Sequence, residues 1–286
     1  MNRLKSIFAA LCRIVIAGIF WVVARLLYDI EFHGLEHDPG RQHTYFAMAH
    51  KRDLDPIVEI PTILAHRGWR ALAGNVHFAM RGDAFSPGFL ARLVMQPRWF
   101  SHFLRLISVG PVLRLLGLHP FENLHFRPAE MWIRELLLIE GNVRAADVLT
   151  PTFLQKVATV AGLDYQQLEK CQLSDLLSWR YQQALQPFCS TEIFIEPARR
   201  HAKSYVLAKF KQELAELVAW LWNGGSLWGA PEGLLSPQGN LGPVTAALRR
   251  LLQAGPPDMC VLPIFIAYDF MTVRRTRIFV DLAPPN

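Results

Sequence analysis

Two residues in the first part of the chain, His50 and Asp55, have the types and the spacing of a base and the carboxylate that orients it. His50 follows residues 44–49, an apolar run that predicts a buried strand, and Asp55 lies at the start of residues 54–64, which predict a helix. Such a turn can bring the carboxylate to one ring nitrogen and leave the other to take a proton from a hydroxyl. The pair predicts general-base chemistry without a protein nucleophile, although the spacing alone also fits a solvated histidine in a surface loop.

Two later segments place further candidate groups on strands. Residues 226–229 predict a strand that runs into Pro231, Glu232 and Gly233, a turn that sets a carboxylate beside exposed glycine backbone. The alternative is an ordinary turn with a solvated glutamate. In the apolar residues 260–267, Pro263 predicts an edge strand or a bulge, because proline cannot donate to a strand ladder. The sheet could open to an acyl chain at such a position.

Four short blocks, taken in order, resemble the glycerolipid acyltransferase family, which is typified by the 1-acylglycerol-3-phosphate acyltransferases. That family carries HxxxxD, a block that begins with Gly-x-x, the sequence Phe-Pro-Glu-Gly-Thr-Arg, and Val-Pro followed by Val or Ile. The matching positions are His50 with Asp55, residues 117–123 (GLHPFEN), residues 230–233 (APEG) and residues 262–264 (LPI). The resemblance covers about residues 30–282 apart from a helical segment, and four ordered blocks are far more specific than any one of them.

The resemblance implies a reaction and a set of substrate-binding residues. It implies that His50 is the general base on an acceptor hydroxyl, that Asp55 holds the imidazole, and that the activated oxygen attacks a thioester directly. Acyl-CoA or acyl-carrier protein is the implied co-substrate, a lysophospholipid is the implied acceptor, and no other cofactor is expected. Substrate contacts are implied for Pro231, Glu232, Gly233, Phe121, Asn123 and Pro263.

The chain differs from the family's pattern at the positions where the family has arginines that bind the acceptor's phosphate. Leu234 and Leu235 stand where the family has Thr-Arg, and Asn123 stands where it usually has Arg. Loss of two charge-assisted contacts weakens phosphate binding unless other residues replace them. Arg127 and Arg81 are the nearest substitutes in sequence. An amino-lipid, glycolipid or pigment acceptor is therefore an alternative, and so is a non-catalytic lipid-binding protein of the same fold.

A metal site and a disulfide framework are not expected. The histidines and aspartates around His50 lack the HxxxH or CxxC spacing that makes a metal site specific. The four cysteines, Cys12, Cys171, Cys189 and Cys260, are isolated in the sequence. They indicate reduced thiols, as in a protein on the cytoplasmic side of a membrane.

The alternation of short apolar runs and helical segments predicts an α/β domain with a mixed central sheet flanked by helices. Residues 71–80, 118–121, 226–229, 260–267 and 277–282 predict further strands, and residues 87–116 and 244–253 predict helices. Residues 128–222 predict a helical insertion, with helical periodicity over residues 165–186 and 202–222. We therefore expect an acyltransferase domain over residues 31–286, interrupted by this insertion.

The first 30 residues predict a membrane-anchoring helix. Residues 7–30 are strongly apolar, follow basic residues at Arg3 and Lys5, and are interrupted by Arg13 and Arg25. A helix that lies in the membrane interface keeps both interrupting arginines at the headgroups. A spanning helix of about 20 residues also fits the length, and so does an ordinary buried helix, whereas a secretory signal fits poorly because the cleavage site is weak.

Composition supports a membrane location. Apolar residues make up 51% of the 286 residues and charged residues only 19%, against roughly 25% charged in an average soluble domain. The net charge is +6, which favours anionic partners. No helix-turn-helix, zinc finger or RNA-binding motif is found, so nucleic acid is not an expected partner. Membrane lipids are the expected partner, at the cytoplasmic face of the inner (plasma) membrane.

Overall fold

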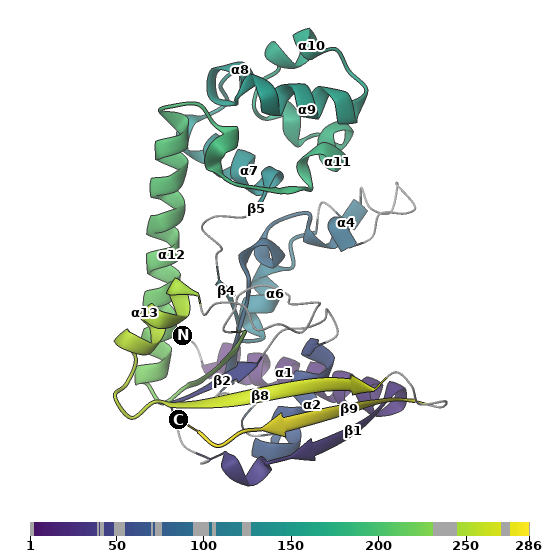
Figure 1. The fold of residues 1–286 in the computed structure, drawn as a ribbon, viewed down its shortest axis with the longest axis vertical. Coiled ribbons are helices and arrows are strands. Elements are labelled where there is room, and N and C mark those ends of the chain that lie inside the picture. The colour runs from purple at the N-terminus through teal and green to yellow at the C-terminus, as the bar shows by residue number, and fades with distance from the viewer. Residues whose placement is uncertain are drawn as a thin grey trace. The chain divides into compact units, whose positions relative to one another are not determined.

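The computed structural model describes residues 3–38, 40, 43–48, 55–69, 71, 76–93, 103–104, 107–121, 127–230, 245–269 and 275–285. The chain forms two compact units (Figure 1). The sheet unit consists of residues 1–80, 112–119 and 214–286, and the helical unit consists of residues 81–111 and 120–213. The long helix α12 (Ala198–Trp222) contributes residues to both units.

The sheet has seven strands among the described residues, in the order β1-β9-β8-β2-β7-β3-β4. Strand β2 lies parallel to β8 on one side and to β7 on the other, and β7 is parallel to β3. Strands β8 and β9 are antiparallel, and β1 is parallel to β9, so the sheet is mixed and mostly parallel. The strands are β1 (Tyr28–His33), β2 (Thr44–Met48), β3 (Val76–Arg81), β4 (Leu118–Phe121), β7 (Ser226–Gly229), β8 (Cys260–Asp269) and β9 (Thr276–Leu282).

The α/β class predicted from the sequence is confirmed, and so are most of the strands. The expected strands at 44–49, 118–121, 226–229, 260–267 and 277–282 are present with small changes at their ends. The strand expected over 71–80 begins only at Val76. Strand β1 was not expected, because its first residues continue the apolar run of the N-terminal helix; that helix ends at Leu27, and Tyr28 already pairs with Thr276.

Helices α1 (Arg3–Leu27) and α2 (Asp55–Arg67) lie side by side in the sheet unit (Figure 1). They contribute Ala17, Ala24, Val58 and Ile63 to one buried cluster with apolar side chains of the central strands. This unit also holds α6 (Gly110–Leu115) for the most part, and α13 (Ala246–Ala254), in which the N-cap Thr245 accepts a hydrogen bond from the backbone of Leu248. By length and composition, residues 7–27 of α1 could cross a membrane, a test that core helices and signal sequences can also pass.

The helical unit has its own buried core between residues 129 and 206. Its first part holds β3's last residue, the 3-10 helix at Gly82–Phe85 and α4 (Phe89–Leu93). Its main helices are α7 (Ala129–Glu140), α8 (Ala145–Val148), α9 (Pro151–Ala161), α10 (Tyr165–Glu169), α11 (Gln182–Leu185) and the first part of α12, with a short antiparallel pair β5 (Arg127–Pro128) and β6 (Phe188–Cys189). Further 3-10 turns of this unit lie at Asp175–Leu177, Trp179–Tyr181 and Thr191–Ile193, and one in the sheet unit lies at Leu35–His37.

Residues 128–222 form mostly helices in the described structure, but the helical periodicity over 165–186 does not produce one continuous helix. The chain forms α10, two 3-10 turns and α11 there. Asp175 accepts a hydrogen bond from the backbone N–H of Gln172, and Ser178 lies in extended conformation between the turns. Short polar side chains of this kind compete with helical hydrogen bonds, which breaks the segment despite its apolar spacing. In contrast, α12 ends as predicted, with Gly224 at a φ of 85°.

Candidate functional site

The fourth sequence block lies on β8, and the chain enters the first and third blocks after β2 and β7, which are the neighbouring central strands in the order β8-β2-β7. In the pairing register, Ala47 of β2 lies opposite Gly229 of β7 on one side and opposite Pro263 of β8 on the other. All three strands run in the same direction, so these residues mark one level near the carboxyl ends of β2 and β7. Carboxyl ends of parallel strands are where open α/β sheets place ligands.

The chain reaches the predicted catalytic and acceptor residues directly after this level. His50 follows the last residue of β2, Met48, by two positions, and Pro231 follows Gly229 by two positions. His50, Asn123, Pro231, Glu232 and Gly233 themselves lie outside the described residues. Asp55 is the first residue of α2, although its side chain is likewise outside the described part of the structure.

Gly229 is held in place by close neighbours from the strands on either side. The hydroxyl of Tyr45 donates a hydrogen bond to the Gly229 carbonyl at 3.1 Å. A β-carbon on Gly229 would lie 3.1 Å from that of Ala79 and 3.2 Å from the Tyr45 oxygen, which is tighter than ordinary contact. Burial raises the pKa of Tyr45, so the phenol stays protonated and keeps donating. The end of β7 is therefore fixed before the chain enters the Pro-Glu-Gly turn.

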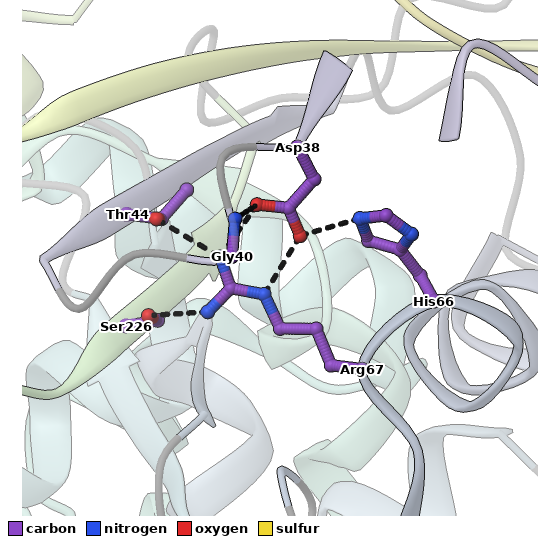
Figure 2. A network of polar contacts seen from close by, with 6 residues as sticks. All are labelled: Asp38, Gly40, Thr44, His66, Arg67 and Ser226. Carbon is purple, nitrogen blue, oxygen red and sulfur yellow. Dashed lines mark hydrogen bonds and ion pairs between the residues drawn. The ribbon is translucent and has the colours of Figure 1, made fainter. Parts of the chain in front are cut away.

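A buried ionic network holds the opposite end of α2 (Figure 2). The guanidinium of Arg67 donates from Nε and Nη2 to the two carboxylate oxygens of Asp38, both at 2.7 Å. His66 Nε2 lies 2.5 Å from Asp38 Oδ2. The same guanidinium donates to Thr44 Oγ1 at 3.0 Å and to Ser226 Oγ at 3.3 Å, the first residues of β2 and β7.

This network positions the helix that begins at Asp55. Helix α2 starts after the carboxyl end of β2 and ends at Arg67, where the network ties it to the amino ends of β2 and β7. The Asp38 carboxylate is fully buried and bidentate, and its hydrogen bonds to Arg67 and His66 outweigh the effect of burial and hold its pKa well below the usual range. The helix predicted from the sequence ends at residue 64, before His66 and Arg67, and local sequence gives no sign of their buried partner.

Pro263 does not lie on an edge strand or in a bulge, so that expectation is wrong. Strand β8 pairs with β2 on one side and with β9 on the other. The ladder with β9 begins at Ile264, and the Pro263 carbonyl accepts a hydrogen bond from the Ala283 backbone N–H at 3.0 Å. In a strand, the nitrogen and the carbonyl of one residue face the same neighbouring strand, so the Pro263 nitrogen faces β9. Because proline has no N–H, the β8–β9 ladder lacks one hydrogen bond at its end. The sheet is closed at Pro263 to an acyl chain entering between strands.

The remaining predicted substrate residues, Phe121 and Arg127, belong to the helical unit. Phe121 packs edge-on against Phe210 at a ring separation of 6.1 Å. Arg127 is only 2% exposed and forms a bidentate ion pair with Glu135, to which Lys209 also donates at 3.4 Å. A phosphate would have to displace Glu135 from this guanidinium, so the contacts of Arg127 do not support its role as a replacement for the missing family arginine.

A second group of buried titratable residues lies in the sheet unit. His119 Nε2 and His77 Nδ1 are 2.8 Å apart, and the His77 ring stacks on Trp220 with ring centroids 3.6 Å apart. Burial, together with the charges of His119 and Arg13, lowers the pKa of His77 to about 3, and burial is also the main cause that lowers the pKa of His119. Both rings are therefore neutral near pH 7, one nitrogen donating and the other accepting.

No protein-family model matches this chain, and no significant match is found among curated proteins or among solved structures. Among the described residues, no group of three or more His, Cys, Asp or Glu side chains is placed to hold a metal ion. The four sequence blocks, and the strands that carry or precede them, are therefore the features of this chain that point to a function.

Proposed function

We propose that the protein is a membrane-associated O-acyltransferase that moves a fatty acyl group from acyl-CoA or acyl-carrier protein to a lipid hydroxyl. The observation that carries this proposal is the register of Ala47, Gly229 and Pro263, because β2 and β7 lead into the first and third blocks and β8 contains the fourth. The ends of β2 and β7, which are about 180 residues apart in sequence, thereby lie side by side in the sheet. Unrelated matches to short motifs have no reason to lie on, or shortly after, three neighbouring strands.

The proposed reaction is a direct acyl transfer. The His50 imidazole takes the proton of the acceptor hydroxyl as its oxygen attacks the thioester carbonyl. A carbon–oxygen bond forms, the carbon–sulfur bond breaks, and the imidazolium returns its proton to the departing thiolate. Asp55 orients the imidazole and stabilises its charged form. The products are an ester and a free thiol, and no acyl-enzyme is formed.

The acceptor in the first form of the proposal is a lysophospholipid of the 1-acylglycerol-3-phosphate type, because that is the substrate of the family that the blocks resemble. A second acceptor class is favoured by the ion pair of Arg127 with Glu135. With Leu234 and Leu235 in place of Thr-Arg, and with Arg127 engaged, an acceptor hydroxyl without a phosphate fits the chain better. Amino-lipids, glycolipids and pigments with a free hydroxyl belong to this class.

The direct test compares two histidine variants of the full chain. With labelled acyl-CoA and an acceptor mixture in detergent, His50→Ala is expected to lower the transfer rate by about 10²- to 10⁴-fold, the usual contribution of a general base. His33→Ala is the matched control, because His33 is an exposed histidine in the same unit, on β1, whose ring pairs with Asp281. Equal transfer rates in the two variants would reject His50 as the base, and absence of transfer in the unmodified protein would favour a lipid-binding role.

A further inference from the structure

Helix α1 has two faces of different character. The inner face carries Arg13, Ala17 and Ala24, of which the two alanines are almost completely buried in the core of the sheet unit. The outer face carries six apolar side chains that are between 49% and 64% exposed: Phe8, Leu11, Val15, Ile19, Val22 and Leu26. At 3.6 residues per turn, these six residues lie within about a quarter of the helix circumference, opposite the inner face. We call this set of six residues the outer stripe.

The inner face is attached to the sheet unit along much of the helix. Arg13 Nε donates to the carbonyl of Leu115 at 3.1 Å. Its guanidinium also lies against Gly117, where an added β-carbon would come within 3.1 Å of Cζ. Further along, Trp69 packs against Gly18, at the border between the inner face and the outer stripe, and after Leu27 the chain enters β1 with no linker.

These attachments are incompatible with a helix that crosses a bilayer. The hydrocarbon core is about 30 Å thick and needs about 20 residues of helix. Only the ten residues from Arg3 to Cys12 precede the first attachment, a length of about 15 Å. Spanning would require α1 to withdraw Ala17 and Ala24 from the core of the unit and to leave Arg13 without its carbonyl partner.

The outer stripe matches the surface of an anionic membrane. It contains no polar side chain over a length of about 27 Å, and Trp69, which is itself exposed, lies beside it at Gly18. Basic residues occur at both ends of the helix: Arg3 and Lys5 in its first residues and Arg25 in its last turn, where Arg275 also donates to the Arg25 carbonyl. An apolar stripe between basic ends is the pattern of a helix that lies in the interface of a membrane containing anionic lipids.

We infer that the outer stripe of α1 is a membrane-binding surface that seats the sheet unit on an anionic lipid bilayer, with the helix axis in the membrane plane. The protein is then monotopic and bound to one leaflet. This inference shares with the proposed function the premise that the chain meets a membrane, but it does not depend on acyl transfer. The two can therefore fail separately.

Flotation with vesicles of phosphatidylglycerol and phosphatidylcholine tests the surface. The variant Val15→Glu/Val22→Glu is expected to lower the vesicle partition coefficient of the full chain at least tenfold, since two apolar side chains leave the lipid. Leu138→Glu is the matched control, because Leu138 is 74% exposed on α7 of the helical unit. Undiminished flotation of the double variant overturns the inference. The inference is also overturned if the wild-type chain does not bind vesicles but forms a dimer that the double variant abolishes, since the stripe would then bind a second copy.

Membrane depth distinguishes the in-plane helix from a spanning one. Spin labels are placed at Phe8, Val15 or Val22 by cysteine substitution in a chain whose four native cysteines are replaced. The expected result is one common immersion depth at all three positions, measured from collisions with oxygen and with a water-soluble nickel complex. A depth that passes through a maximum at Val15, with Phe8 and Val22 shallower, overturns the inference. Acyl transfer to an acceptor dispersed in detergent is measured alongside, and its loss in a His50→Ala chain that still floats separates the two results.

Discussion

At the scale of single residues, the structure departs most from what local sequence could indicate in the Asp38 network. Residues 29 positions apart form a buried bidentate pair that also reaches the first residues of β2 and β7.

Arg67→Met is expected to lower the free energy of unfolding by about 3–5 kcal/mol, because it leaves the buried Asp38 charge without its main partner. Denaturant unfolding measures this. Asp281→Asn, which breaks an exposed pair with His33, should change stability by less than about 1 kcal/mol, and equal effects of the two variants would contradict the account.

The buried histidines make stability depend on pH. The folded-state pKa of His77 is lowered to about 3, so between about pH 6.5 and pH 3 the unfolded chain binds a proton there that the folded chain does not. The free energy of unfolding therefore decreases as the pH is lowered through this window, by about 1.4 kcal/mol per pH unit from His77 alone. His119 acts in the same direction, since burial, Arg114 and Arg13 lower its pKa against the opposing effect of Glu216.

A substitution that keeps the stack on Trp220 isolates the His77 contribution. Between about pH 7 and pH 5, His77→Phe should lose about 2 kcal/mol less stability than the unmodified chain, as measured by urea unfolding at both pH values. Asp38 does not obscure the comparison. Its lowered pKa contributes stability that is present above the unfolded value of about 4 and is lost only below it. Parallel pH profiles of the two proteins would show that His77 titrates normally.

At the scale of elements, apolar runs bounded by turn residues sufficed to predict β2, β7, β8 and β9, because buried central strands have this local pattern. Strand β1 could not be predicted, because its apolar residues continue those of α1 and its partner β9 is about 250 residues away in sequence. The place of Pro263 inside the sheet depends on where β9 ends, which no local pattern encodes. The same holds for the candidate site. Its four blocks could be recognised in the sequence, but the adjacency and register of β2, β7 and β8 could not.

The junction of β1 and β9 offers a test at this scale. Gly34 has a φ of 70°, and an added β-carbon would lie 2.1 Å from the Leu282 carbonyl oxygen at the end of β9. Gly68 has nearly the same φ, 69°, with no atom within 4 Å of such a carbon. Gly68→Ala is expected to cost about 1–2 kcal/mol for the left-handed backbone alone. Gly34→Ala should cost about 1–3 kcal/mol more because of the clash, and equal costs in thermal unfolding would contradict this packing.

At the scale of the whole molecule, the two units have separate cores. The core of the helical unit lies within residues 129–206, and the core of the sheet unit draws on α1, α2 and the strands. Leu154→Ala, at a buried position of the helical unit, should destabilise that unit by about 2–5 kcal/mol. Hydrogen exchange should then show faster exchange in α7 and α9 with unchanged protection in β2 and β8. Faster exchange in both units together would show that the chain unfolds as one.

We propose that the carboxyl edge of β2 and β7 carries an acyl transfer from a thioester to a lipid hydroxyl. The most direct measurement incubates the full-length protein with isotopically labelled long-chain acyl-CoA and a membrane lipid extract, and follows free thiol and labelled lipids by mass spectrometry. We expect a labelled lipid ester in equal amount to the released thiol, with both lost in His50→Ala and retained in His33→Ala. Thiol release without any labelled ester, or labelled ester formed equally by His50→Ala, would contradict it.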